Sequence, residues 1–239
     1  MNTVRGSTAS ETKMIKAIQR AVGAAEDGLI GTATMSGLAA KVGAACFPLN
    51  LTIYGQPTII ANDILPIASP GKGLAAFAHS INGSFYYQGK PCSICVAGGE
   101  VKSATACHGW LGKPETVLYK RGGYIYARRC KSAADLPSGV QWAVGGMGLG
   151  NYYDPEAEGF SGKYADVLRK TNHSMLGCKG GKLYLVYCKG MTGAQVDAHA
   201  RKLGLELAIM LDDGHIAGIN TTHAKINTGI TQYYVVQGI

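Results

Sequence analysis

The chain lacks any apolar run long enough to cross a membrane, and its N-terminus lacks the apolar core of a signal peptide. These absences predict cytoplasmic synthesis without a signal peptide and no membrane span. Action at the bacterial cell envelope then requires another route of release, such as a separate membrane pore.

Acidic residues are scarce, with 15 Asp and Glu against 23 Lys and Arg, so the formal net charge is +8. This excess suits an anionic partner such as a nucleotide, a phosphate-bearing polymer or an envelope surface. The basic residues are dispersed, and no run resembles a nucleic-acid-binding arm. We therefore expect an anionic ligand and no nucleic-acid polymer; no pattern indicates the oligomeric state.

The seven cysteines are an odd number, which excludes a fully paired disulfide framework. Cys92 and Cys95 have the spacing of a metal-ligand pair, and Cys107 precedes His108, but a second Cys-x-x-Cys pair is lacking. We expect reduced thiols that act as small apolar side chains, with no metal site and no cofactor.

The sequence does contain a candidate strand that is followed directly by residues able to act as acids and bases. Residues 207–211 are five consecutive apolar residues, the length of a buried strand, and Asp212, Asp213, Gly214 and His215 follow at once. A rigid strand can hold acid and base groups in fixed geometry at its end. A plain hairpin turn with a solvated histidine is the alternative interpretation.

The preceding residues favour a site. Residues 182–188 alternate like a strand, and residues 190–204 predict a helix with Thr192 as N-cap and Gly204 at its end. Within the helix, Ala194, Val196, Ala200 and Leu203 have core-like spacing. Strand, helix and strand together predict a β–α–β-like unit whose last strand ends at Asp212.

Residues 10–43 form a distinct piece. Residues 12–22 predict a helix, capped by Ser10 or Thr12, and a turn at 26–34 leads to a second helix at 32–41. The first helix has apolar residues at helical spacing, namely Met14, Ile15, Ile18 and Val22.

This piece resembles the peptidoglycan-binding-like repeat. The matching residues, in order, are Ile18-Gln19, Asp27-Gly28, Ile30-Gly31 and Thr34. The resemblance implies a peptidoglycan-binding-like helical module at 10–43. A small helical packing module without a ligand is the alternative.

Residues 46–239 are richer in strand signals and predict an α+β domain with a mainly β core. The strand candidates are 47–53, 58–61, 94–96, 117–119 and 124–127. Asn82-Gly83 is a tight-turn signal, and aromatic residues including Tyr86 follow it. Aromatic faces beside an amide suit a sugar site, and a hairpin with core aromatics is equally simple.

The order of short motifs in this region resembles the phosphodiester glycosidase domain. These motifs are Ile-Asn-Gly-Ser-Phe at 81–85, Gly-Lys-Pro at 89–91, Gly-Gly-Glu-Val at 98–101, Ser-Met-Leu-Gly at 174–177, Leu-Tyr-Leu-Val at 183–186, Gly-Met-Thr at 190–192 and Leu-Asp-Asp-Gly at 211–214. The resemblance implies that 46–239 are a phosphodiester-glycosidase-like domain.

The departures from the family pattern fall at the implied site. His173-Ser174 stands where the family has Arg-Thr, Asp213 and His215 replace glycines, and Ile216 replaces a serine. Losing an arginine removes a bidentate phosphate clamp, which a histidine replaces only in part. The departures leave altered or lost activity open.

The resemblance implies the following roles. Asp212, His215 and His173 are the catalytic candidates, and the substrate-binding candidates are Asn82, Tyr86, Ser174, Thr192, Asp213 and Gly214. Neighbouring residues on an extended strand point to opposite sides, so we expect one aspartate to face the ligand, and Asp212 is the one in register with the family motif. Several of these residues have plain structural alternatives, such as Thr192 as a helix cap.

The function that the resemblance implies is that of a hydrolase: a glycosidase cleaving a sugar-1-phosphodiester, with a sugar-phosphate or cell-wall glycan as ligand. A lytic bacteriophage enzyme acting on a cell-wall polymer would fit the missing signal peptide. The alternatives are a non-catalytic binding protein that sequesters a nucleotide or sugar phosphate, and a structural or assembly protein that uses the fold as a scaffold.

Overall fold

The computed structural model describes residues 4–5, 8–30, 34 and 48–239. The chain divides by its contacts into two compact units, Met1–Phe47 and Pro48–Ile239. The fold class is α+β with mostly strand, as predicted. Among the described residues, no helix is long and apolar enough to cross a membrane. The assignment of these parts to a peptidoglycan-binding-like module and a second domain stays a prediction.

In the N-terminal unit, helix α1 spans Ala9–Val22 and begins earlier than predicted. Its N-cap is Thr8 rather than Ser10 or Thr12, because the Thr8 hydroxyl accepts the Glu11 N–H and the Glu11 carboxylate accepts the Thr8 N–H. Of its apolar residues, Ile15 is buried and Met14 is 60% exposed.

The buried amide of Gln19 ties α1 to the following turn. Its Nε2 lies 2.7 Å from Asp27 Oδ1, 2.8 Å from the Leu29 carbonyl and 3.2 Å from Thr34 Oγ1. Its Oε1 accepts the N–H of Gly28. Strands β1 (Val4–Arg5) and β2 (Leu29–Ile30) pair beside it. The predicted second helix at 32–41 lies, except for Thr34, outside the described residues.

The larger unit contains a ten-stranded antiparallel sheet among its described residues. In spatial order its main path is β10 (Glu100–Ser103), β9 (Cys95–Ala97), β13 (Val140–Leu149), β16 (Leu207–Asp213), β14 (Thr171–Lys179), β15 (Lys182–Met191), β4 (Gln56–Ala61) and β3 (Leu49–Ile53). Off this path, β11 (Glu115–Arg121) pairs with β13 and with β12 (Tyr124–Cys130).

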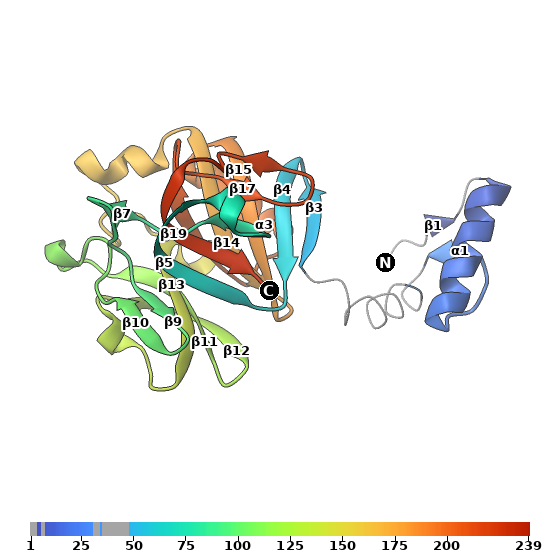
Figure 1. The fold of residues 1–239 in the computed structure, drawn as a ribbon, viewed down its shortest axis with the longest axis horizontal. Helices are drawn as coiled ribbons and strands as arrows, with labels where there is room; N and C mark the ends of the chain where they lie inside the picture. Colours follow the sequence, from blue (N-terminus) through green and yellow to red (C-terminus); the bar gives the residue numbers. More distant parts are fainter. Residues whose placement is uncertain (1–3, 6–7, 31–33, 35–47) are drawn as a thin grey trace. The chain divides into compact units, whose positions relative to one another are not determined.

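A second sheet packs against the first. Its order is β18 (Lys225–Ile226), β17 (Ile219–Asn220), β6 (Ser80–Asn82), β19 (Thr231–Gly238) and β5 (Ile64–Gly73). Figure 1 shows β5 and β19 side by side, as their pairing requires. A short hairpin of β7 (Tyr86–Tyr87) and β8 (Lys90–Pro91) follows β6.

The central strands of the large sheet are buried on both faces, and β16 shows how their residues are divided. Ile209 and Leu211 belong to the core that also contains residues of the second sheet, such as Ile81. Ala208 and Met210 belong to a second core on the opposite face. Because strand side chains alternate, the continuous apolar run of β16 fills both cores.

The predicted strand–helix–strand unit is confirmed. Helix α3 spans Gly193–Leu203, with Thr192 as N-cap in a capping box and Gly204 as a left-handed C-cap. Its residues Val196, Ala200 and Leu203 pack in the second core. Strand β14 lies between β15 and β16 and is antiparallel to both, so β15 and β16 run parallel on either side of it.

The other strand predictions are confirmed with shifted boundaries, since 58–61, 117–119 and 124–127 lie within β4, β11 and β12. The hairpin turn predicted at Asn82-Gly83 was wrong. Strand β6 ends at Asn82, and a Cβ on Gly83 would lie 2.3 Å from Cγ of Tyr234. Glycine is therefore required here for close packing against an aromatic ring.

Candidate active site

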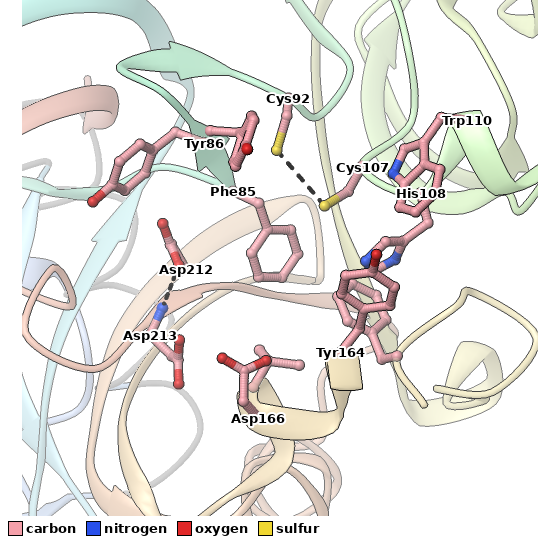
Figure 2. A pocket seen from close by; sticks show the side chains of 13 residues that line it. Phe85, Tyr86, Cys92, Cys107, His108, Trp110, Tyr164, Asp166, Asp212 and Asp213 are labelled. Carbon is pink, nitrogen blue, oxygen red and sulfur yellow. Dashed lines mark hydrogen bonds between the residues drawn. The ribbon is translucent and has the colours of Figure 1, made fainter. Parts of the chain in front are cut away.

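A cavity of about 790 Å³ opens beside the end of β16. Its walls are formed by Phe85, Tyr86, Tyr87, Cys92, Cys107, His108, Trp110, Phe160, Tyr164, Asp166, Val167, Asp212 and Asp213. Figure 2 shows Asp212 and Asp213 on one side and His108, Trp110 and Tyr164 on the other. We call these the acidic end, which includes Asp166, and the aromatic end, which includes Phe85 and Phe160.

Both aspartates of β16 line the cavity, so the expectation that only Asp212 faces it was wrong. The cause is an irregularity in the pairing of β16 with β14. Asp213 pairs with His173 and Met210 with Met175, so β16 takes three steps where β14 takes two. The extra residue of this bulge disturbs the alternation where both aspartates border the cavity.

The two carboxyls have different electrostatic surroundings. Burial raises the pKa of Asp212 to about 8, and the nearby carboxyls of Asp213 and Asp166 favour its protonated form further. The Asp213 N–H donates to Asp212 Oδ1 at 2.9 Å and offsets this only in part. At neutral pH, Asp212 is therefore mostly protonated.

Asp213 has a cation beside it. Burial raises its pKa, while the guanidinium of Arg169, with Nη2 3.6 Å from Asp213 Oδ2, lowers it. Arg169 is half exposed and also lies 3.3 Å from Asp166 Oδ2. The pair thus combines a neutral acid with a carboxyl whose ionised form has a counter-charge.

His173 lies under Asp213 and has no exposed surface, so it does not reach the cavity. Its Nε2 is 2.8 Å from the Met191 carbonyl and 3.2 Å from the Arg169 carbonyl, so this nitrogen carries the proton. Burial lowers the pKa of His173. Its Nδ1 and Asp213 Oδ2 are buried atoms without a hydrogen-bond partner in the described part of the chain.

Asn82 and Ser174 are fully buried, and their hydrogen bonds support the backbone of the acidic end. The Ser174 hydroxyl donates to Asn82 Oδ1 at 2.5 Å, and Asn82 Nδ2 donates to the backbone carbonyl of Asp212 at 3.1 Å. The Gly218 N–H also donates to Asn82 Oδ1. Asn82 thereby fixes the end of β16 to β6, and its side chain does not line the cavity.

Of the remaining predicted site residues, one lines the cavity and three do not. Tyr86 lines the cavity at its acidic end, where burial and the Asp212 carboxyl raise its pKa. Thr192 is partly buried and caps α3, His215 is exposed beyond the turn, and Gly214 has a φ of 68° and donates its N–H to the Asn172 carbonyl. None of these last residues forms part of the cavity wall.

The aromatic end was missed in the sequence, apart from Phe85 within the Ile-Asn-Gly-Ser-Phe motif. His108 donates from Nδ1 to the Glu158 carbonyl at 3.0 Å, and burial lowers its pKa, so it is neutral with Nε2 as an acceptor. Gly159 has a φ of 89°, and a Cβ there would lie 2.9 Å from His108 Cβ. In the sequence, the Cys107-His108 pair indicates a metal site at most and gives no sign of an aromatic wall.

Two buried glutamates support this end without lining the cavity. Glu115 accepts the N–H groups of Ile94 at 2.6 Å and Cys107 at 3.0 Å, and burial raises its pKa to about 8. Burial likewise raises the pKa of Glu158 to about 7, and its carboxyl accepts from the Thr116 hydroxyl at 2.5 Å. Their positions far apart in sequence gave no local signal.

The cysteines of the described residues are free thiols. Cys92 neighbours Cys107, with 3.7 Å between the sulfur atoms, rather than Cys95 of the same Cys-x-x-Cys pair. The hydrogen bond with Cys92 and burial both raise the pKa of Cys107. In the part of the chain that the structure describes, no cluster of three His, Cys, Asp or Glu residues could hold a metal ion.

The larger unit thus has an α+β fold with a bulged central strand that presents two carboxyls to a cavity. Among solved structures, the chain is similar to the zebrafish N-acetylglucosamine-1-phosphodiester alpha-N-acetylglucosaminidase catalytic domain, auto-inhibited by its pro-peptide. The TM-score is 0.59 at 14% identity, over 80% of this chain and 81% of that chain.

A hypothetical protein from Synechocystis is also similar, with a TM-score of 0.51 at 12% identity over 79% of this chain and 60% of that chain. No family model matches the chain, and no curated protein matches it in sequence. At these identities the likeness shows the fold alone, and this is the fold that the motifs of 46–239 implied.

Proposed function

We propose that the larger unit is a glycosidase that cleaves a sugar-1-phosphodiester, with Asp212 and Asp213 as its acting groups. The observation that carries this proposal is the pair of neighbouring carboxyls in one cavity wall with opposed surroundings. Burial raises the pKa of both carboxyls, but only Asp213 has a cation beside it, and such a difference in surroundings is a basis for dividing acid and base roles.

Asp212, whose pKa burial raises to about 8, is protonated at neutral pH and can donate its proton to the leaving oxygen. Asp213, whose ionised form Arg169 favours, can stabilise the positive charge that develops at the anomeric carbon. The bond between the anomeric carbon and the leaving oxygen breaks, and a water oxygen forms the new bond to the anomeric carbon. The leaving oxygen takes the proton of Asp212, and a proton from the attacking water returns to Asp212.

The charges near the cavity and on the whole chain support a phosphodiester as the substrate. A protonated Asp212 does not repel an anion, and Arg169 lies half exposed beside the carboxyls of Asp213 and Asp166, where it can donate hydrogen bonds to a phosphate oxygen. The net charge of +8 favours the approach of an anionic substrate in the same way.

A cell-wall polymer is the substrate source that we propose, with residues 10–43 as a peptidoglycan-binding-like module that delivers the enzyme. The support is the network of Gln19, which joins the pattern residues Asp27, Gly28 and Thr34. Sedimentation of the wild-type chain and of Gln19→Ala with purified peptidoglycan tests it, and equal retention of both chains contradicts it.

The test of the activity is hydrolysis of a methyl diester of N-acetylglucosamine 1-phosphate, and of purified wall polymer, in ¹⁸O-labelled water. A glycosidase places the label on the anomeric carbon of the released sugar, whereas cleavage at phosphorus places it on phosphate. Mass spectrometry distinguishes the two products, with Asp212→Asn as the inactive control. Binding of the diester without turnover would overturn the proposal in favour of a sequestering protein.

A further inference from the structure

The aromatic end of the cavity presents a continuous series of rings. Trp110 packs edge-on against Tyr164 at 5.8 Å between ring centres, Tyr164 lies 5.0 Å from His108, and His108 lies 4.7 Å from Phe160. Phe160 in turn lies 5.2 Å from Phe85. The series runs from an exposed tryptophan to a buried phenylalanine, with Figure 2 showing Trp110, His108 and Tyr164 opposite the carboxyls.

Trp110 has 67% of its surface exposed although it belongs to a firmly held segment. The 3₁₀ helix Gly109–Leu111 that carries it follows Cys107, whose N–H is bonded to the buried Glu115. His108 is anchored to the Glu158 carbonyl, and the Ala106 N–H to the Lys131 carbonyl. The tryptophan is thus presented on a fixed support, which lowers the entropic cost of binding a ligand against it.

The chemistry of this end differs from that of the carboxyls. The described lining of the cavity contains no Lys or Arg, although Lys163 Nζ, outside the lining, lies 5.0 Å from the ring centre of Tyr164. Aromatic faces take up the apolar C–H faces of a sugar ring, and the neutral His108 offers Nε2 as an acceptor for a hydroxyl. A neutral ring with hydroxyl groups therefore fits against these aromatic faces.

We propose that Trp110, Tyr164 and His108 form a second sugar-binding subsite that takes a neutral pyranose ring beyond the sugar held at Asp212 and Asp213. This rests on the proposed function for the identity of the first sugar, and it deepens that function. The preferred substrate is then an oligosaccharide phosphodiester rather than a single sugar phosphodiester.

The fluorescence of the chain can report this subsite directly. The sequence has two tryptophans, and Trp142 is buried, with its Nε1 donating to Asp63 Oδ1 at 2.7 Å. Saccharide binding therefore changes the emission of Trp110 while that of Trp142 stays constant. The readout needs no turnover, so it is independent of the proposed activity.

The experiment titrates neutral chitooligosaccharides into the wild-type chain, Trp110→Ala and the matched control Leu111→Ala, whose residue is exposed in the same 3₁₀ helix but does not line the cavity. Saturable emission changes, with affinity rising from monosaccharide to disaccharide, are expected for the wild type and the control. Isothermal calorimetry should show a loss of about tenfold in affinity for Trp110→Ala.

Inorganic phosphate serves as the anionic probe and should leave the emission of Trp110 unchanged. A response to phosphate without one to saccharides overturns the subsite, as does unchanged saccharide affinity in Trp110→Ala. If saccharides bind at Trp110 while the labelled-water experiment shows no sugar release, the subsite stands and the proposed hydrolysis fails. If sugar is released but no neutral saccharide binds, the proposed hydrolysis stands and the subsite fails.

Discussion

The two ends of the cavity are held in different ways. At the acidic end, paired strands and a buried amide network place Asp212, since Asn82 joins its backbone to Ser174 and to the second sheet. At the aromatic end, the rings come from connecting segments, and buried Glu115 and Glu158 satisfy the polar groups behind them. Strand register positions the charged groups, whereas the Glu115 carboxyl and the Glu158 backbone carbonyl position the loop that carries His108 and Trp110.

Because the supports differ, changes at one end should leave the other end working. A substitution at Asp212 should remove chemistry without disturbing saccharide binding at Trp110. A substitution at Glu115 should do the reverse by loosening the aromatic end first. The following experiments test this separation.

The largest effect is expected for Asp212→Asn, which we expect to lower turnover by on the order of a hundredfold or more. Asn is nearly isosteric but donates no acidic proton. The carboxyl has a folded-state pKa of about 8, raised above the unfolded value of 3.8, so the contribution of Asp212 to stability is greatest below about pH 4 and falls as pH rises toward 8.

Asp212→Asn lacks this titration. Its melting temperature at pH 8 should therefore match or exceed that of the wild type, while chitooligosaccharide binding at Trp110 is retained. Activity and melting temperature are measured on the same preparation. Wild-type turnover in the mutant would remove Asp212 from the mechanism, and loss of saccharide binding would break the separation of the two ends.

The second effect concerns Glu115→Ala, which leaves the N–H groups of Ile94 and Cys107 buried without acceptors. Unsatisfied buried groups cost about 1–3 kcal/mol each, so the free energy of unfolding should fall by roughly 3 kcal/mol or more. Glu115→Gln keeps one acceptor and should cost less. Urea unfolding measures both, and equal losses for the two variants would contradict the role given to the carboxyl.

Much of the acidic end was predictable because its signals are local. The apolar run of β16 followed by Asp212, and the capped helix α3 before it, are patterns within a few residues. The pairing irregularity that turns Asp213 into the same cavity was not predictable, since it depends on how β16 pairs with β14. A period-two pattern alone implies one aspartate on each face.

The buried supports were missed for a related reason. Ser174 and Asn82 are 92 positions apart, and Thr116 and Glu158 are 42 apart, so neither hydrogen bond leaves a local pattern. Trp110 and Tyr164 carried no periodic signal because 3₁₀ helices in connecting segments position them. Asn82 was named through a motif, yet its buried amide supports the backbone of Asp212.

The third effect is the pH dependence of turnover. A proton donor must be protonated, so kcat should fall about tenfold per pH unit once pH rises above about 8, the pKa of Asp212. Asp213→Asn removes a neighbouring negative charge that raises this pKa, so the alkaline fall should begin at lower pH. A profile flat to pH 10, or one that shifts upward in Asp213→Asn, would contradict the assignment of Asp212 as donor.

The smallest effect is expected for Thr192→Ala, which separates a cap from a ligand-binding role. The Thr192 hydroxyl accepts the N–H of Gln195 at 3.3 Å, and Gln195 accepts the N–H of Thr192 at 2.9 Å. Losing this N-cap should lower the free energy of unfolding by about 1 kcal/mol. Because Thr192 lies outside the cavity wall, KM for the diester and saccharide affinity should both stay unchanged. Thr192→Ser, which keeps the hydroxyl, should restore most of the stability. A rise in KM for Thr192→Ala that Thr192→Ser reverses would instead place this hydroxyl in contact with substrate and extend the acidic end to the start of α3.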